Sequence, residues 1–349
     1  MSEVLADTTS ASVDSEGNIH DASNVRNEFN PMQYGTFKCE YWDYFNLFKI
    51  ILDLVHLDDT RAHFHIEFIV LETLPHDSSA FTQGVSFFDG YLYEGTGLYG
   101  SSELRKLDPK DPKNPLQTFS IPSEFFGEGI THYRNAKGEH RLIQLTWKEG
   151  QALVYDAKKL KVLFSFEYHI ESSNGEGWGI TFDSQANEFI VSDGSTSLFF
   201  WDVAEIDDCE VEATSENEKV DEYNEIRLCD VEVEPRRSVT VQAFVNQSPD
   251  PIPVQYLNEL EFVASASSNA IGGSLTHTVL ANIWFQEYIL EIDPKSGNVL
   301  KLFDLSSLCP ERSPRGENVL NGISISEDGD RVLYVTGKNW DSMYKIILV

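Results

Sequence analysis

The stretch "EGITHY" (128–133) begins a pattern that recurs at four other places in the chain. Each copy starts with a polar or aromatic residue, continues with a small or short residue, and then alternates apolar with polar residues. This alternation has the period of a β-strand with one buried face. The other copies are "QGVSFF" (83–88), "WGITFD" (178–183), "NELEFV" (258–263) and "NGISIS" (321–326). Five copies of one motif indicate a repeat architecture.

Each copy is followed by further runs that are typical of β-strands. Second runs lie at 91–97, 141–147, 188–194, 279–284 and 331–338, and third runs at 103–108, 152–156, 197–202, 288–293 and 342–347. Fourth runs are visible at 116–121, 162–168 and 299–305. Four strands per unit and five units predict an all-β fold, a five-bladed β-propeller.

The two ends of the repeat region predict how the ring closes. The last repeat has no fourth run, because the sequence ends at Val349, whereas a spare run, "HFHIEFIVLETL" (63–74), precedes the first repeat. We expect this N-terminal strand to complete the last blade, since that pairing removes two open sheet edges at once. The propeller domain is therefore predicted to span residues 61–349.

The segments outside the repeats predict one extension and two insertions. Residues 1–60 are predicted to form a poorly structured extension, disordered or helical, and its apolar run 44–55 is too short to cross a bilayer. An acidic insertion at about 205–245 is interpreted as a solvated surface loop, and 265–277 as a flexible loop. Cys209 and Cys229 share the acidic insertion, where a disulfide and two free thiols both remain open.

Charge excludes one class of partner. The chain of 349 residues carries a formal net charge of −31, so it would repel the phosphates of nucleic acid. The first residues have neither the basic nor the apolar segment of a secretory signal. No run of the sequence predicts a transmembrane segment.

The repeats also predict a functional site, because equivalent residues of a propeller lie in a ring around its channel. The first positions of the five copies are Gln83, Glu128, Trp178, Asn258 and Asn321. The ends of the second runs add Glu94 or Thr96, Trp147, Asp193, Trp284 and Lys338 near the same mouth. A concave, aromatic mouth with a few placed polar groups is typical of a small-molecule site.

Three classes of function could use this mouth. Glu128, Asn258, Asn321 and Asp193 are oxygen ligands that suit calcium, as in a calcium-dependent lactonase or esterase. Alternatively, a single carboxylate in an aromatic cage could move protons near neutral pH, because burial raises its pKa. Lys338 and the tryptophans favour the second class, since a cation and apolar rings are poor companions for a metal ion. A non-catalytic binding scaffold is the third class.

An ordered series of motifs resembles the plant-type glutaminyl-peptide cyclotransferases, also called glutamine cyclotransferases. The series runs from Phe81 to the end of the chain and is far more specific than any single motif. It comprises "FTQGVSFFDGYLYEGTGLYGSSELRKLD" (81–108), "FGEGIT" (126–131), "QLTW" (144–147), "EGWGIT" (176–181), "SDGS" (192–195), "LNELE" (257–261), "LANIW" (280–284), "VLNGIS" (319–324) and "VTGKNW" (335–340).

The resemblance implies a five-bladed propeller enzyme that converts the N-terminal glutamine of peptides or proteins to pyroglutamate and releases ammonia. It implies that Glu128 is the catalytic acid/base. It places the substrate pocket at Phe81, Gln83, Phe126, Trp147, Trp178, Asn258, Trp284 and Lys338. No cofactor and no metal ligand is expected for catalysis, although members can carry a structural calcium ion in the channel. We also expect a monomer, and the plant members' secretory location implies the secretory pathway.

Overall fold

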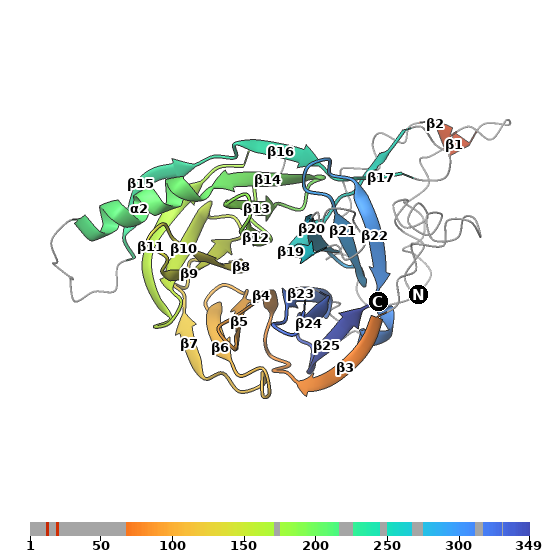
Figure 1. The fold of residues 1–349 in the computed structure, drawn as a ribbon, viewed down its shortest axis with the longest axis horizontal. Helices are drawn as coiled ribbons and strands as arrows, with labels where there is room; N and C mark the ends of the chain where they lie inside the picture. The colour runs from red at the N-terminus through yellow and green to blue at the C-terminus, as the bar shows by residue number, and fades with distance from the viewer. Residues whose placement is uncertain are drawn as a thin grey trace.

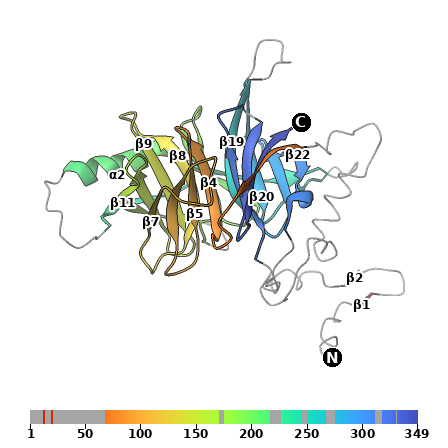
Figure 2. The ribbon, with the colours of Figure 1, turned by 90° about the horizontal axis from the view of Figure 1, so that it is seen from below.

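The computed structural model describes residues 12–13, 19–20, 68–170, 175–215, 226–244, 250–266, 275–310, 317–329 and 331–349. Five antiparallel sheets stand around a central axis like the blades of a propeller (Figure 1). The side view shows the strands running roughly along that axis (Figure 2). The predicted five-bladed β-propeller is therefore confirmed.

Each blade has four antiparallel strands, and blade 2 has a fifth, parallel strand at its outer edge. The four strands lie in chain order from the channel outward, with one exception described below. Blade 1 contains β4 (Thr82–Phe88), β5 (Tyr91–Thr96), β6 (Glu103–Leu107) and β7 (Gln117–Ser120). Blade 2 contains β8 (Gly127–Arg134), β9 (His140–Thr146), β10 (Gln151–Asp156) and β11 (Lys161–Tyr168). Blade 3 contains β12 (Ile180–Asp183), β13 (Glu188–Ser192), β14 (Ser197–Asp202) and β16 (Arg237–Thr240). Blade 4 contains β19 (Leu257–Ala266), β20 (Leu275–Ile283), β21 (Tyr288–Ile292) and β22 (Val299–Asp304).

The exception is blade 5, which both ends of the described propeller build together. Its inner strands are β23 (Leu320–Ile325), β24 (Val332–Gly337) and β25 (Ser342–Leu348), and its outer strand is β3 (Phe68–Pro75). Strand β3 pairs antiparallel with β25 from Pro75 opposite Ser342 to Phe68 opposite Leu348. The prediction that an N-terminal strand completes the last blade is confirmed, and the pairing leaves the ring closed.

The acidic insertion is more ordered than predicted. Residues 203–215 form helix α2 (Val203–Ser215), and strand β15 (Leu228–Val233) pairs parallel with the outer strand β11 as a fifth strand of blade 2. A disulfide joins Cys209 of the helix to Cys229 of the strand. Because Ile206, Cys209 and Val233 are fully buried against blades 2 and 3, the interpretation of these parts as a solvated loop is wrong. A few apolar residues and one covalent link are enough to dock an otherwise acidic segment.

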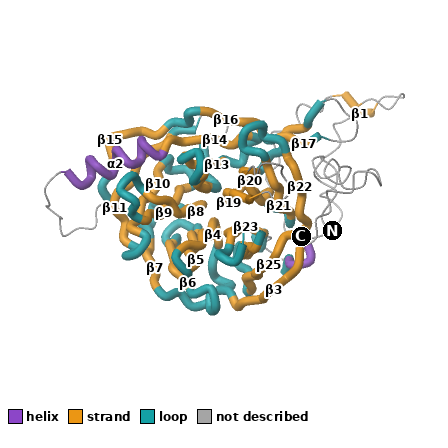
Figure 3. Tube along the Cα trace, viewed as in Figure 1, coloured by secondary structure: helices purple, strands orange, loops and turns teal. Residues whose placement is uncertain are grey.

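The second insertion is partly strand. Strands β19 and β20 extend into the segment that was predicted to be a flexible loop, and their last pair is Ala266 opposite Leu275. Figure 3 shows that strands and loops make up nearly all of the ring, with α2 on its outer side.

The predicted extension lies mostly outside the described residues, as does its apolar run 44–55. The described part of the extension is a pair of two-residue strands, β1 (Ser12–Val13) and β2 (Ile19–His20). The short strands β17 (Gln242–Ala243) and β18 (Ile252–Pro253) form another small sheet. No described helix is both long and apolar enough to cross a membrane.

Candidate active site

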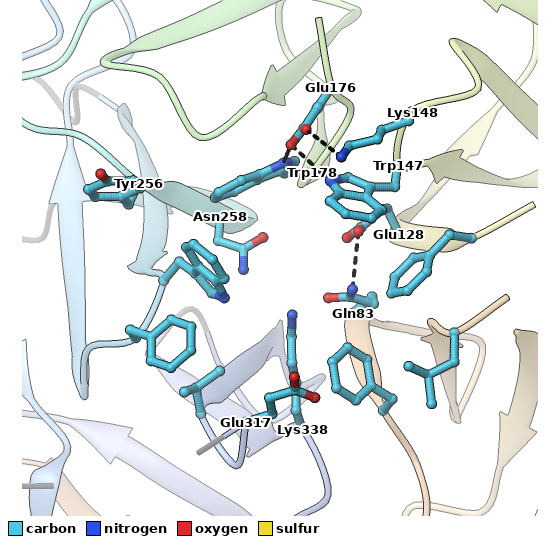
Figure 4. Close-up of a pocket in the computed structure, with 16 residues that line it drawn as sticks. Gln83, Glu128, Trp147, Lys148, Glu176, Trp178, Tyr256, Asn258, Glu317 and Lys338 are labelled. Carbon is cyan, nitrogen blue, oxygen red and sulfur yellow. Dashed lines mark hydrogen bonds and ion pairs between the residues drawn. The ribbon is translucent and has the colours of Figure 1, made fainter. Parts of the chain in front are cut away.

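A pocket of about 470 Å³ opens at one mouth of the channel (Figure 4). It brings together all nine residues that the sequence analysis assigned to catalysis or substrate binding. These are Phe81, Gln83, Phe126, Glu128, Trp147, Trp178, Asn258, Trp284 and Lys338. The pocket also contains seven residues that were not predicted: Leu98, Lys148, Glu176, Tyr256, Phe285, Glu317 and Val319. The gathering is a structural fact, whereas the roles of the nine residues stay predictions.

The five-fold repeat accounts for much of the pocket wall. The wall includes the residue two places before each predicted ring position. These wall residues are Phe81, Phe126, Glu176, Tyr256 and Val319. Three of them were missed, although extending the repeat alignment by two residues would have found them. The side chains outside this rule, such as Phe285 and Glu317, carry no signal in the repeats.

Glycines explain why two strand ends do not contribute to the pocket as predicted. Trp147, Trp284 and Lys338 each directly follow a second strand and line the pocket. By the pairing register of the first two strands, the corresponding residues of blades 1 and 3 are Gly97, directly after β5, and Gly194, two places after the end of β13. A Cβ at Gly97 would lie 2.4 Å from the ring of Phe126, and one at Gly194 would lie 2.5 Å from the ring of Trp178. Aromatic rings therefore fill the space that side chains of blades 1 and 3 would need.

The predictions for the mouth are accordingly corrected at two strand ends and one ring position. Glu94, Thr96 and Asp193 are buried but do not line the pocket. Asn321 lies behind the pocket wall, where its Nδ2 donates a hydrogen bond to Oε1 of Gln83 at 2.8 Å. Of the four oxygen ligands considered for a calcium-dependent hydrolase, Glu128 and Asn258 line the pocket, whereas Asn321 and Asp193 do not. No cluster of three or more His, Cys, Asp or Glu suited to a metal ion occurs in the described part of the chain.

The two glycines around Glu128 allow neighbouring backbones to approach closely. A Cβ at Gly129 would lie 2.6 Å from the carbonyl oxygen of Trp178, to which its N–H donates. A Cβ at Gly127 would lie 2.7 Å from the carbonyl oxygen of Thr96. The space beside Gly127 is therefore filled by protein, by the carbonyl oxygen of Thr96 and the side-chain amide of Gln144, and is not open to a substrate. Both glycines instead let strand β8 fit between its neighbours and place Glu128 at the pocket.

A short chain of amides orients the Glu128 carboxylate. Nε2 of Gln83 donates a hydrogen bond to Oε1 of Glu128 at 3.1 Å (Figure 4). The Oε1 of Gln83 in turn accepts the hydrogen bond from Asn321, so the amide of Gln83 is held from both ends. Within the described residues, this is the one hydrogen bond that the Glu128 carboxylate accepts. The carboxylate therefore keeps acceptor capacity for a ligand.

Burial shifts the pKa values of the acid and the cation in opposite directions. Burial raises the pKa of Glu128 well above its usual range, the charge of Lys338 lowers it, and the charges of Glu176 and Glu149 raise it further. Burial lowers the pKa of Lys338 to about 8, although Glu128 and Glu317 act against this shift. A buried acid with a raised pKa in a cleft is a candidate for proton transfer.

Aromatic rings form the sides of the pocket. Phe126 contacts Phe81 edge-to-face at a centroid distance of 6.2 Å and Trp147 at 5.4 Å. On the opposite side, Trp178 and Trp284 meet edge-to-face at 5.3 Å. The ammonium of Lys338 lies 4.8 Å from the centroid of Phe81, a favourable cation–π distance. These contacts fix the shape of an apolar slot around the acid.

Two of the tryptophans do not offer their N–H groups to a ligand. Nε1 of Trp147 and Nε1 of Trp178 both donate hydrogen bonds to Oε2 of Glu176, at 2.8 and 2.9 Å. Both indole N–H groups are therefore already engaged within the protein. The pocket also contains donor groups on Lys338, Asn258, Gln83 and Trp284.

Comparison with known proteins gives concordant matches. A family model described as glutamine cyclotransferase matches residues 52–234 and 231–348, which include all five blades. A glutaminyl-peptide cyclotransferase from Arabidopsis thaliana is 32% identical over 286 residues, covering 81% of this chain and 71% of the relative. The crystal structure of a glutaminyl cyclase from Myxococcus xanthus matches with a TM-score of 0.57 and 26% identity. That match covers 82% of this chain and 99% of the Myxococcus chain.

Proposed function

The chain belongs to the glutamine cyclotransferase family, and we propose that it converts N-terminal glutamine of peptides or proteins to pyroglutamate with Glu128 as proton carrier. The family resemblance drawn from the motifs is confirmed, and with it the assignment to a class of transferase enzymes. The observation that supports the role of Glu128 most directly is its setting. It is a buried acid with a raised pKa and a single hydrogen bond, held in an aromatic pocket beside a lysine.

Proton transfer is needed at both nitrogens of the substrate. The α-amine of a peptide has a pKa of about 7.7–8.0, so near neutral pH it is mostly an ammonium group that cannot attack. The Glu128 carboxylate accepts one proton from it. The neutral nitrogen then bonds to the side-chain amide carbon and closes a five-membered ring, and the carbonyl oxygen becomes an oxyanion.

Collapse of this tetrahedral intermediate breaks the bond to the side-chain nitrogen. Glu128 gives its proton to that nitrogen, which leaves as ammonia, and accepts the proton that the ring nitrogen loses. Transfer of this second proton to ammonia releases ammonium and restores the carboxylate. Positioned acid/base catalysis of this kind contributes about 10²–10⁴-fold. The raised pKa suits Glu128 to both directions of transfer near neutral pH.

Lys338 and Asn258 are proposed to bind the oxyanion. With a pKa of about 8, Lys338 is mostly protonated at neutral pH and can donate. Asn258 is buried, and its amide points into the pocket (Figure 4). One well-placed donor to an oxyanion lowers the activation free energy by about 3–4 kcal/mol. The aromatic slot would hold the glutamine side chain folded back on its own amine, which favours ring closure.

Release of ammonia from a dipeptide that begins with glutamine tests the proposed function. We expect ammonia and a cyclised product in equal amounts, with and without a chelator. A dipeptide that begins with asparagine is the matched control, since its shorter side chain would have to close a strained four-membered ring. If the glutamine dipeptide gives no ammonia in either condition, the chain is a binding scaffold or another kind of enzyme. Lactone or ester cleavage that disappears with chelator would favour the calcium-dependent hydrolase.

A structural calcium ion in the channel is a separate proposal. Calcium takes six to eight oxygen ligands, and a buried carboxylate oxygen without a hydrogen-bond partner could be one of them. Glu259 on β19 reaches across the ring, where its Oε1 accepts a hydrogen bond from the N–H of Val85 on β4 at 3.2 Å. Its buried Oε2 has no hydrogen-bond partner among the described residues. Glu259 would therefore hold the ion, which would tie β19 to the inner strands and supply no chemistry to the reaction.

A further inference from the structure

Glu176 departs from the five-fold pattern of the pocket wall. It occupies the position two places before the ring residue of blade 3. The other blades place apolar or aromatic residues there: Phe81, Phe126, Tyr256 and Val319. Packing of the wall therefore does not explain why blade 3 carries a carboxylate at this position.

The Glu176 carboxylate joins two tryptophans from different blades. Its Oε2 accepts hydrogen bonds from Nε1 of Trp147 at 2.8 Å and from Nε1 of Trp178 at 2.9 Å (Figure 4). Trp147 directly follows strand β9 of blade 2, whereas Trp178 precedes strand β12 of blade 3. The other oxygen, Oε1, lies 3.5 Å from Nζ of Lys148. One side chain thus links the two blades at the pocket wall.

The backbone around Glu176 supports this link. The N–H of Gly177 donates to the carbonyl oxygen of Trp147 at 3.0 Å, so the two segments already lie side by side. A Cβ at Gly177 would come within 2.0 Å of the hydroxyl of Tyr168, which leaves the segment little freedom to shift. These backbone contacts do not by themselves fix the rotation of the indole rings about their side-chain bonds. The Glu176 carboxylate fixes that remaining freedom, since a charged acceptor makes hydrogen bonds roughly twice as strong as a neutral one.

We propose that Glu176 is a positioning residue that binds both indole N–H groups and thereby holds Trp147 and Trp178 in place against the bound N-terminal glutamine. By taking both donors, it leaves the rings to offer apolar surface to the substrate. Its effect on turnover rests on the proposed function, whereas its effect on the indoles does not. The two effects are therefore measured separately.

Nuclear magnetic resonance of the indole N–H groups tests the hydrogen bonds directly. The chain has six tryptophans, and the variants Trp147→Phe and Trp178→Phe assign the two signals of interest. We expect both signals, and no other indole signal, to move upfield in Glu176→Leu, because both hydrogen bonds are lost. Glu176→Gln keeps one acceptor oxygen without the charge and should produce smaller shifts of the same two signals. If neither signal moves in either variant, the proposal is wrong.

Steady-state kinetics test the positioning effect. We expect kcat/KM for a glutamine dipeptide to fall by about 10- to 100-fold in Glu176→Leu, because small misplacement of a binding wall is costly. Glu176→Gln should recover part of this loss. Retention of full kcat/KM in Glu176→Leu would overturn the positioning role, even if the indole signals move. If the wild type shows no cyclisation, the proposed function fails, and the indole signals alone decide whether Glu176 fixes the rings.

Glu149→Gln is the matched control for charge. Like Glu176, Glu149 raises the pKa of Glu128 by its charge, but its carboxylate accepts a hydrogen bond from the hydroxyl of Tyr99 at 2.8 Å. Removing either charge lowers the pKa of Glu128, so the acidic limb of the pH profile should move to lower pH in both Gln variants. Only the Glu176 variants should also move the indole signals and lower kcat/KM at the pH optimum. An equal loss of kcat/KM in Glu149→Gln would assign the whole effect to charge and contradict positioning.

Discussion

Two buried glutamates in neighbouring blades have opposite electrostatic environments. Glu94 on β5 and Glu128 on β8 are almost completely buried, with exposed fractions of 1% and 5%. Burial alone would raise the pKa of both. The pKa of Glu94 is nevertheless lowered, whereas that of Glu128 is raised well above its usual range.

The partners of the two carboxylates account for the difference. Glu94 Oε1 accepts hydrogen bonds from Nε2 of His76 at 2.9 Å and from the hydroxyl of Thr82 at 2.7 Å. Its Oε2 lies 3.7 Å from the guanidinium of Arg105. These groups together outweigh the effect of burial. Glu128 instead accepts one hydrogen bond from a neutral amide, and the charge of Lys338 does not outweigh burial.

The comparison separates a structural acid from a functional one. A buried carboxylate that is saturated with partners stays ionised and adds to stability. A buried carboxylate with few partners holds its proton more tightly and keeps acceptor capacity for a substrate. The predictions below change one member of this comparison at a time.

Replacing Glu128 should have the largest effect, and on turnover alone. Glu128→Gln keeps the shape and the hydrogen bond from Gln83 but cannot carry a proton, so we expect kcat/KM for ammonia release to fall by about 10²–10⁴-fold. The free energy of unfolding at pH 8 should not fall, because the variant removes a buried acid that has few partners. Ammonia assays and denaturant unfolding check the two parts. Unchanged turnover would remove Glu128 from its assigned role.

The sequence predicted the fold and the centre of the site better than the periphery of either. The five-fold repeat places Gln83, Glu128 and Trp178 at the mouth without any knowledge of the contacts, because equivalent strands reach the channel at equivalent residues. It could not show that Asn321 turns away to hold Gln83, since side-chain direction depends on neighbouring blades.

The errors near the rim have a related physical cause. Glu94 occupies a strand near the mouth, but its carboxylate lies against His76, Thr82 and Arg105 and not in the pocket. Likewise, the sequence left open whether Cys209 and Cys229 form a disulfide, and the acidic composition of the insertion gave no sign that it docks on blade 2. Both outcomes depend on contacts between segments far apart in the chain, which local patterns do not encode.

Replacing Glu94 should mainly affect stability. Glu94→Gln leaves His76 and Arg105 without their shared buried anion, and we expect the free energy of unfolding to fall by about 3 kcal/mol. Turnover should change little, because Glu94 does not line the pocket. The matched control is Glu103→Gln. Glu103 also pairs with Arg105, but its side chain is 25% exposed, and its loss should cost no more than about 1 kcal/mol.

The loss of free energy of unfolding in Glu94→Gln should depend on pH in a defined direction. Burial lowers the pKa of His76, but Glu94 and the carbonyl oxygen of Trp340 more than compensate, so the pKa is raised overall. The contribution of His76 to the free energy of unfolding is therefore full below pH 6.5 and is lost as the pH rises through the pKa of the folded state. The pKa of Glu94 is lowered, so its contribution to the free energy of unfolding is present above pH 4.5 and is lost as the pH falls through the pKa of the folded state. The difference in free energy of unfolding between wild type and Glu94→Gln should therefore be largest between pH 4.5 and pH 6.5. A gap that is the same at all pH values would contradict the assigned ion pair.

Glu259 extends the comparison to a third buried glutamate and gives the smallest expected effect. Burial, with the charge of Glu261 added, raises its pKa well above the usual range, although hydrogen bonds from the backbone of Val85 and Ile323 lower it. If calcium binds there, it should raise the free energy of unfolding of the wild type by about 2.7 kcal/mol at a hundred times its Kd. The effect should weaken at low pH, because the cation and the proton compete for the carboxylate.

Glu261→Gln is the control for Glu259→Gln, because the two acids lie two residues apart on the same strand. Glu261 is also buried, with a pKa of about 8, but its Oε1 accepts hydrogen bonds from the N–H of Ile325 and the hydroxyl of Ser324. Calcium should therefore still stabilise Glu261→Gln and should not stabilise Glu259→Gln. Thermal unfolding with calcium and with chelator measures both. If calcium still stabilises Glu259→Gln, the ion binds elsewhere. If calcium does not stabilise the wild type, the proposed calcium site is wrong.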